Sequence, residues 1–177
     1  DPVIDRERAA TLLGSTKDRA ENVMIVDLMR NDIGRACRTG SVHVEKLCAL
    51  ESYANVHHLV SVVTGALADG ETPLSLLEHC FPGGSITGAP KIRAMQVIDE
   101  LEPDARSIYC GSVGYVSFDG NMDTSITIRS LAWDGEQIHA WGGGGIVADS
   151  RCDTEYRESL TQVAPLLEEL RPGALAE

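Results

Sequence analysis

The sequence lacks any apolar run of about 20 residues, which is the length that a membrane-spanning helix needs. It is also short of positive charge, because 15 lysines and arginines face 27 aspartates and glutamates, giving a formal net charge of −12 at pH 7. A chain this acidic repels phosphate backbones and anionic lipid, so we expect no nucleic acid and no membrane as partners. The balance is still compatible with a small anionic substrate, because a local site can be positive inside a negative shell.

Paired cysteine motifs are absent as well. The chain has an odd number of widely spaced cysteines and no C-x-x-C, which argues against a disulfide framework or a cysteine zinc site. The five are Cys37, Cys48, Cys80, Cys110 and Cys152. Reduced thiols indicate a cytoplasmic protein. Because the sequence opens at Asp1 without a methionine, we take the chain to be a fragment or a processed product.

The composition, 43% hydrophobic and 24% charged, is that of a globular protein. Residues 5–13 are interpreted as a short helix or an approach segment. Periodicity and start and stop signals predict a helix that begins at a cap, Ser15 or Asp18, and ends at residue 34. They also predict helices over 74–80, 90–101 and 153–170, the last ending before Pro172-Gly173. It predicts strands over 41–53, 58–67, 112–118, 122–133 and 137–141, with hairpin turns at Asp119-Gly120 and Asp134-Gly135. Hairpins without alternating βαβ units predict an α+β fold, an antiparallel sheet with packed helices.

Two glycine-rich segments are candidate binding elements. The turn Gly83–Gly88 precedes a helix and suits an anion, although a tight structural turn explains it equally well. The run Gly142–Gly145 offers no side chain to a core, so its use is to let the backbone approach a ligand or another strand closely.

Charged residues give weaker signals. Glu155 and Glu158 share a helix face and could hold Mg²⁺, or they could form a solvated acidic face. Glu21 is a candidate for the same site only if the fold brings it beside Glu158. Arg129 ends the strand segment 124–128, where a half-buried guanidinium would need an anion, either a ligand or an internal acid. His58 borders an apolar run and is more often a hydrogen-bonded core residue. The polar cluster at the end of the second predicted helix is interpreted as a structural network that stabilises this helix end; it consists of Asp27, Arg30, Asn31 and Asp32.

Four segments in this order resemble the chorismate-utilising enzymes: residues 20–32, 81–95, 123–129 and 143–150. That family includes anthranilate synthase component I, aminodeoxychorismate synthase component I, isochorismate synthases and salicylate synthases. The resemblance runs from about Ser15 to Leu170. It implies that residues 1–177 are the C-terminal part of a single chorismate-binding domain, an α/β sandwich like that of anthranilate synthase component I.

Within the family, one segment is most similar in sequence to the aminodeoxychorismate synthases. It reads Pro82-Gly83-Gly84-Ser85-Ile86-Thr87-Gly88-Ala89-Pro90-Lys91. This implies amination of chorismate at C4 to 4-amino-4-deoxychorismate, for 4-aminobenzoate and folate, with ammonia from a glutamine amidotransferase partner. One alternative is anthranilate synthase component I, which aminates C2. Another is a non-catalytic assembly half that forms a homodimer through exposed strands.

The resemblance also implies roles for individual residues. It implies that Glu21, Glu155 and Glu158 hold Mg²⁺ against the ring carboxylate, and that Arg129 and Tyr109 grip the enolpyruvyl carboxylate. It implies further substrate contacts from Ser85 and from the backbone of Gly143, Gly144 and Gly145, with His58 as a catalytic residue near the reacting ring.

Two departures from the family pattern matter. The lysine of a P-I-K-G-T motif, which forms a covalent intermediate in the aminodeoxychorismate enzymes, has no match in this sequence. Gln162 stands where many relatives carry lysine. We therefore expect residues 1–177 alone to be inactive.

Overall fold

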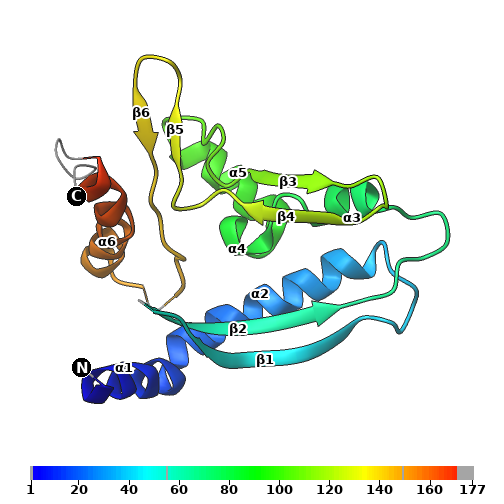
Figure 1. Cartoon of the computed structure of the whole chain (residues 1–177), viewed down its shortest axis with the longest axis horizontal. Coiled ribbons are helices and arrows are strands. Elements are labelled where there is room, and N and C mark those ends of the chain that lie inside the picture. Colours follow the sequence, from blue (N-terminus) through cyan, green and yellow to red (C-terminus); the bar gives the residue numbers. More distant parts are fainter. Residues whose placement is uncertain (1, 55, 149, 171–177) are drawn as a thin grey trace. The chain divides into compact units, whose positions relative to one another are not determined.

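The computed structural model describes residues 2–54, 56–148 and 150–170. The chain divides into two units, Asp1–Val97 and Ile98–Glu177. Both units mix helices with antiparallel strands (Figure 1), which confirms the α+β class. Asp149 and the Pro172-Gly173 pair, which the sequence patterns included, lie outside the described residues. Whether the chain is part of one single domain stays a prediction.

The first unit opens with two consecutive helices, α1 (Pro2–Gly14) and α2 (Thr16–Gly34). Ser15 separates them, and its hydroxyl accepts a hydrogen bond from the Asp18 N–H at 3.2 Å. This bond satisfies one of the backbone donors that a helix leaves open at its start. Ser15 is therefore the cap, and Asp18, the other predicted cap, lies inside the first turn.

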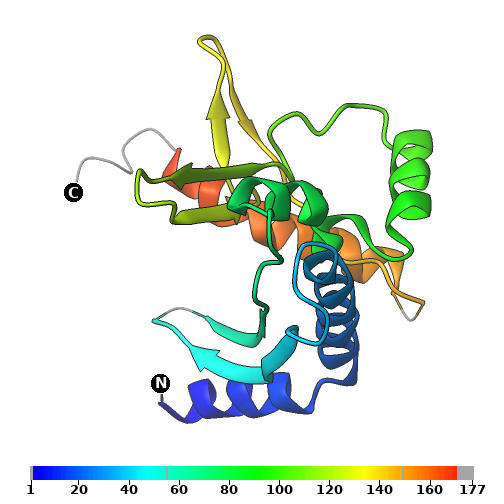
Figure 2. The ribbon, with the colours of Figure 1, turned by 90° about the vertical axis from the view of Figure 1, so that its right-hand side faces the viewer.

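Two antiparallel strands follow, β1 (His43–Ser52) and β2 (His57–Thr64). Their register shifts between Lys46 and Ala49, which is a β-bulge on β1. Cys48 in the bulge has φ 50°, and its N–H donates to the Ser61 hydroxyl at 2.9 Å. Helix α2 lies against this pair of strands (Figure 2), where the Asn22 side chain donates to the Leu59 carbonyl at 2.9 Å.

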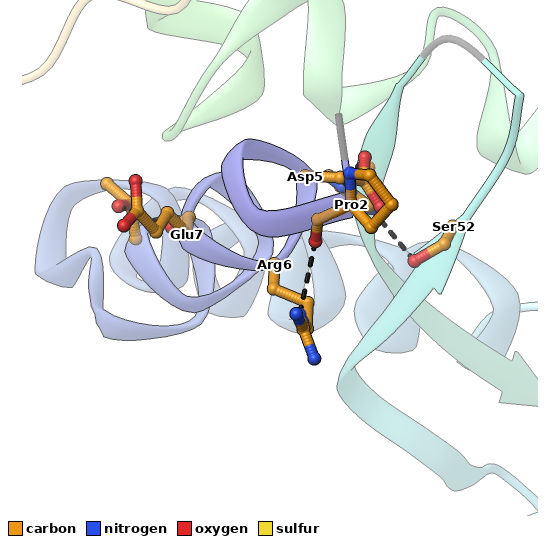
Figure 3. Close-up of polar contacts among 7 residues, drawn as sticks. Pro2, Asp5, Arg6, Glu7 and Ser52 are labelled. Atoms are coloured by element: carbon orange, nitrogen blue, oxygen red, sulfur yellow. Dashed lines mark hydrogen bonds and ion pairs between the residues drawn. The ribbon is translucent and has the colours of Figure 1, made fainter.

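Helix α1 is joined to the end of the β1–β2 pair by a histidine. The His57 Nε2 atom lies 3.0 Å from Asp5 Oδ1, and His57 Nδ1 lies 2.8 Å from the Ser52 hydroxyl. Figure 3 labels both partners of His57, Asp5 on its helix and Ser52 on its strand. His57 thus connects the first helix to the strands.

Three helices complete the segment between the two strand regions: α3 (Pro73–Cys80), α4 (Gly84–Thr87) and α5 (Lys91–Leu101). Helix α3 starts at a capping box in which Thr72 and Ser75 bond reciprocally. The predicted loop before α5 contains the single turn α4. Gly84 is buried there, and an added Cβ would lie 2.7 Å from Leu28 Cδ1. Glycine at this position therefore lets α4 approach α2 closely.

The second unit contains two hairpins and a long helix. Strands β3 (Ser112–Val116) and β4 (Met122–Ile126) form the first hairpin, and β5 (Leu131–Trp133) and β6 (Ile138–Ala140) form the second. Helix α6 (Cys152–Glu169) follows. Gly120 and Gly135 have φ 88° and 107°, so both predicted turns are confirmed. Among the described residues the strands form three separate two-stranded sheets.

The prediction of one strand over residues 122–133 is wrong. Pairing stops at Ile126, and Arg129 adopts φ 49°, a left-handed conformation that cannot continue a strand. The chain therefore turns between β4 and β5.

The first hairpin of the second unit is largely uncovered. The side chains of Val113, Tyr115 and Val116 are all more than half exposed, and Phe118 at the turn is exposed as well. A hairpin without a covering layer is marginally stable in water.

Within the described residues, no helix combines the length and the hydrophobicity needed to cross a membrane.

Candidate functional site

The predicted site residues fall in both units, and their geometry is defined within each unit. The first unit carries Glu21, His58 and Ser85, and the second carries Tyr109, Arg129, Gly143, Gly144, Gly145, Glu155 and Glu158.

The glycine run approaches α6 at two positions, Gly142 and Gly144. A Cβ added at Gly142 would lie 2.3 Å from Val163 Cγ2 and 2.8 Å from the Ser159 carbonyl oxygen. A Cβ added at Gly144 would lie 3.5 Å from both Glu155 Oε2 and Glu158 Oε1. Gly142 therefore packs against a helix, a partner that the sequence reasoning did not consider. Gly144 faces the two carboxylates.

The two glutamates differ in burial. Glu155 is 8% exposed, whereas Glu158, one turn later on the same face of α6, is exposed. Hard carboxylate oxygens of this kind suit Mg²⁺, which binds through one or two carboxylates and keeps several waters. No group of three or more histidine, cysteine, aspartate or glutamate side chains suited to a metal gathers within either unit's described residues. The second unit therefore offers a pair of carboxylates, Glu155 and Glu158, as metal ligands.

Tyr109 lies beside the second glycine of the run. A Cβ added at Gly143 would lie 2.7 Å from the Tyr109 hydroxyl oxygen. The Tyr109 ring stacks on Trp141 with a centroid distance of 6.2 Å and an interplanar angle of 5°. Burial raises the pKa of Tyr109, so its phenol stays protonated at neutral pH and can donate to an anion.

A charged side chain also supports the Tyr109 ring. The Arg106 guanidinium lies 5.9 Å from the ring centroid and pairs with Glu102 through bonds of 2.6 and 2.8 Å. This pairing lowers the pKa of Glu102 and raises that of Arg106. The sequence reasoning missed Arg106 and Trp141. The spacing of Glu102 and Arg106 and the position of Trp141 just before the glycine run were the available signals.

Arg129 is exposed, so the expectation of a half-buried guanidinium is wrong. The reason is the strand end at Ile126, after which the backbone turns away from the ladder. Among the described residues, no hydrogen bond or ion pair engages the Arg129 side chain. The guanidinium is therefore accessible to an external anion, and its role in binding stays a prediction.

In the first unit, His58 lies on β2 at a hollow of about 550 Å³ between β2 and α2. Asn22, Val26 and Met29 of α2 line the same hollow. The His58 ring is half buried and meets the Tyr53 ring edge-on at 5.9 Å. Glu21 is half buried on α2, immediately before Asn22, while Ser85 is exposed on α4. The roles proposed for these three residues stay predictions.

Two sequence motifs of the first unit meet in a buried ion pair. Lys91 Nζ lies 2.6 Å from Asp32 Oδ2 and also donates to the Cys80 carbonyl at 3.3 Å. The Asp32 side chain is 5% exposed and the Lys91 side chain 18%. This contact confirms that the charged cluster at the end of α2 is a structural network. It also gives Lys91, at the end of the glycine-rich loop, a structural partner.

We expect Asp32→Asn to lower the free energy of unfolding by about 2–3 kcal/mol, because it leaves the Lys91 ammonium without its buried counter-charge. The control is Asp27→Asn on the same helix, which removes an exposed 3.1 Å pair with Arg30. That change should cost no more than about 0.5 kcal/mol. Urea unfolding of the two variants beside the parent chain measures both values, and equal midpoints for the variants would contradict the prediction.

Comparison with known proteins gives a single family across almost the whole chain. Residues 1–168 match the family model described as chorismate binding enzyme. The chain is 56% identical over 170 residues to aminodeoxychorismate synthase component 1 of Escherichia coli (strain K12), covering 96% of this chain and 38% of that protein. It is 48% identical over 163 residues to anthranilate synthase component 1 of Aquifex aeolicus (strain VF5), covering 92% of this chain and 33% of that protein.

A solved structure agrees with these sequence matches. The crystal structure of anthranilate synthase component I from Streptococcus pneumoniae TIGR4 superposes with a TM-score of 0.77 at 40% sequence identity. The match covers 90% of this chain and 38% of that one. It confirms the predicted architecture, and the chain spans little more than a third of the length of these relatives.

Proposed function

Because the chain belongs to the family of chorismate binding enzymes, we propose that it is part of a protein that aminates chorismate at C4. The product is 4-amino-4-deoxychorismate, and the ammonia comes from a glutamine amidotransferase partner. Higher identity to the aminodeoxychorismate synthase of Escherichia coli than to the anthranilate synthase of Aquifex aeolicus supports this choice.

One structural observation carries the proposal. The glycine run passes between the Tyr109 hydroxyl at Gly143 and the two α6 carboxylates at Gly144. A hydrogen-bond donor and a pair of cation ligands thus lie at neighbouring backbone positions that have no side chains. Chorismate is a dianion, and such an arrangement can accept one carboxylate directly and the other through a metal ion.

In this proposal the residues of the second unit divide the two substrate carboxylates between them. Arg129 and Tyr109 bind the enolpyruvyl carboxylate, and the backbone of Gly143–Gly145 leaves room for the substrate. Glu155 and Glu158 would hold Mg²⁺, and Glu21 of the first unit is a further proposed ligand. A bound ion there would supply the positive charge that neutralises the ring carboxylate and favours loss of the C4 hydroxyl.

The first unit supplies the remaining proposed contacts. In this proposal His58 is a catalytic residue that donates a proton to the departing C4 hydroxyl, and Ser85 donates a hydrogen bond to the substrate. The hydroxyl leaves as water, and ammonia takes its place and gives up a proton as the new C–N bond forms. We still expect residues 1–177 alone to be inactive, because they contain no match to the lysine motif of the aminodeoxychorismate enzymes.

A product assay tests the proposal against amination at C2. The full-length product of the reading frame is incubated with chorismate, Mg²⁺ and ammonium, and the products are separated by chromatography. We expect 4-amino-4-deoxychorismate, which a lyase converts to 4-aminobenzoate. Fluorescent anthranilate as the main product would instead support the anthranilate synthase reading.

A further inference from the structure

Tyr109 and Arg129 come from two backbone segments in an uncommon conformation. Ser107 and Cys110, on either side of Tyr109, have φ 53° and 65°, and Arg129 has φ 49°. For residues other than glycine this region costs of order 1 kcal/mol or more each, and it persists only when the surroundings hold it. The two side chains proposed to grip one carboxylate therefore depend on whatever fixes these two turns.

Thr127 is the residue that joins the two turns. It is 9% exposed and lies two positions before Arg129. The Cys110 N–H donates to the Thr127 carbonyl at 2.9 Å, and the Thr127 N–H donates to the Gly111 carbonyl at 3.0 Å. The Thr127 hydroxyl donates to the Ile108 carbonyl. The three partners, Ile108, Cys110 and Gly111, lie within two positions of Tyr109. Thr127 therefore forms hydrogen bonds to the backbone both before and after Tyr109.

We infer that Thr127 is a positioning residue that sets the spacing between Tyr109 and Arg129 for a shared substrate carboxylate. This inference rests on the proposed function of those two side chains. Thr127 itself is buried, and its hydrogen bonds within the part of the chain that the structure describes go to the backbone of the Tyr109 turn. Its two backbone bonds can form with any residue other than proline at this position, so the part of the role specific to threonine resides in the hydroxyl.

The hydroxyl matters because the Ile108 carbonyl is crowded. It also accepts the Gly111 N–H at 3.0 Å, and a Cβ added at Gly111 would lie 2.9 Å from it. A second donor there resists rotation of the peptide group that leads into Tyr109. Loss of that donor would let the Tyr109 hydroxyl move relative to Arg129, and binding weakens when the groups that hold a ligand are no longer fixed in the bound geometry.

The test compares Thr127→Val, which keeps the shape and removes the hydroxyl, with Thr127→Ser, which keeps the hydroxyl. Both are made in the full-length product of the reading frame. We expect Thr127→Val to raise the chorismate KM by about tenfold with kcat within about twofold, the pattern of lost binding rather than lost chemistry. Thr127→Ser should stay near the parent KM.

Hydrogen exchange of residues 106–111 gives a second readout that needs no activity. We expect exchange in this segment to be faster in Thr127→Val than in Thr127→Ser and the parent. Equal exchange in the two variants, or an unchanged KM in Thr127→Val, would overturn the role of the hydroxyl. If the parent protein does not turn over chorismate, the proposed function fails, and the exchange comparison alone decides whether the hydroxyl fixes the turn.

Discussion

Replacing Glu158 with glutamine is expected to lower the rate of chorismate amination by about a hundredfold or more in the full-length protein, since a metal ion supplies several kcal/mol of charge stabilisation. Glu158 Oε1 faces the backbone of Gly144 together with Glu155 Oε2. An amide keeps the size of the side chain but loses the charge that a hard cation requires. The measurement is kcat at saturating chorismate over a series of Mg²⁺ concentrations.

The matched control is Glu168→Gln, which changes an exposed glutamate near the other end of the same helix. It should leave both kcat and the Mg²⁺ dependence unchanged. Glu158→Gln should also need more Mg²⁺ for half-maximal rate. If its rate and its Mg²⁺ dependence both match those of the control, Glu158 is not a metal ligand, and the acidic-face reading of this pair would replace the metal-site reading.

Local signals in the sequence predicted most of the elements, because those signals act over a few residues. Ser15 caps α2 by accepting one backbone hydrogen bond, and Thr72 caps α3 in the same way. Gly120 and Gly135 supply the positive φ that the two hairpin turns need. Each of these features depends on neighbours within about four positions along the chain, so the pattern alone is sufficient.

The errors occur where tertiary contacts override the local pattern. Residues 122–133 have the composition of one strand, but the chain turns at Arg129, in a segment where Thr127 is bonded to the residues around Tyr109. Those partners lie 16 to 19 positions away in the sequence, and no periodicity reports them. The same turn explains why the Arg129 side chain is exposed, although its position at the end of a predicted strand indicated a half-buried guanidinium.

In the candidate site, too, local patterns predicted some features and missed those that depend on tertiary packing. The spacing of Glu155 and Glu158 predicted a shared helix face, and both carboxylates do face Gly144. The purpose of the glycine run was left open between a ligand and a strand. Gly142 instead meets Ser159 and Val163 of α6, because this helix packs on the run. Propensity can indicate that a backbone approaches something closely, but only the packed structure identifies the partner.

The second large effect concerns Arg129. We expect Arg129→Ala to raise the chorismate KM by about 30-fold or more, because a guanidinium that bonds a carboxylate through two N–H groups is worth several kcal/mol in a desolvated complex. Arg129→Lys should recover only part of this loss, since an ammonium keeps the charge but lacks the planar fork. The measurement is the KM for chorismate at low and at moderate salt.

Salt dependence separates charge from shape in this comparison. An attraction between opposite charges weakens as salt screens it, so the parent KM should rise with ionic strength, and that rise should be smaller in Arg129→Ala than in Arg129→Lys. The control is Arg38→Ala, which removes an exposed arginine that pairs with Asp69 in the first unit. It should leave the KM unchanged at both salt concentrations. An Arg129→Ala protein whose KM lies within twofold of this control would show that another cation binds the substrate carboxylate, and the left-handed backbone at residue 129 would then have a purely structural origin.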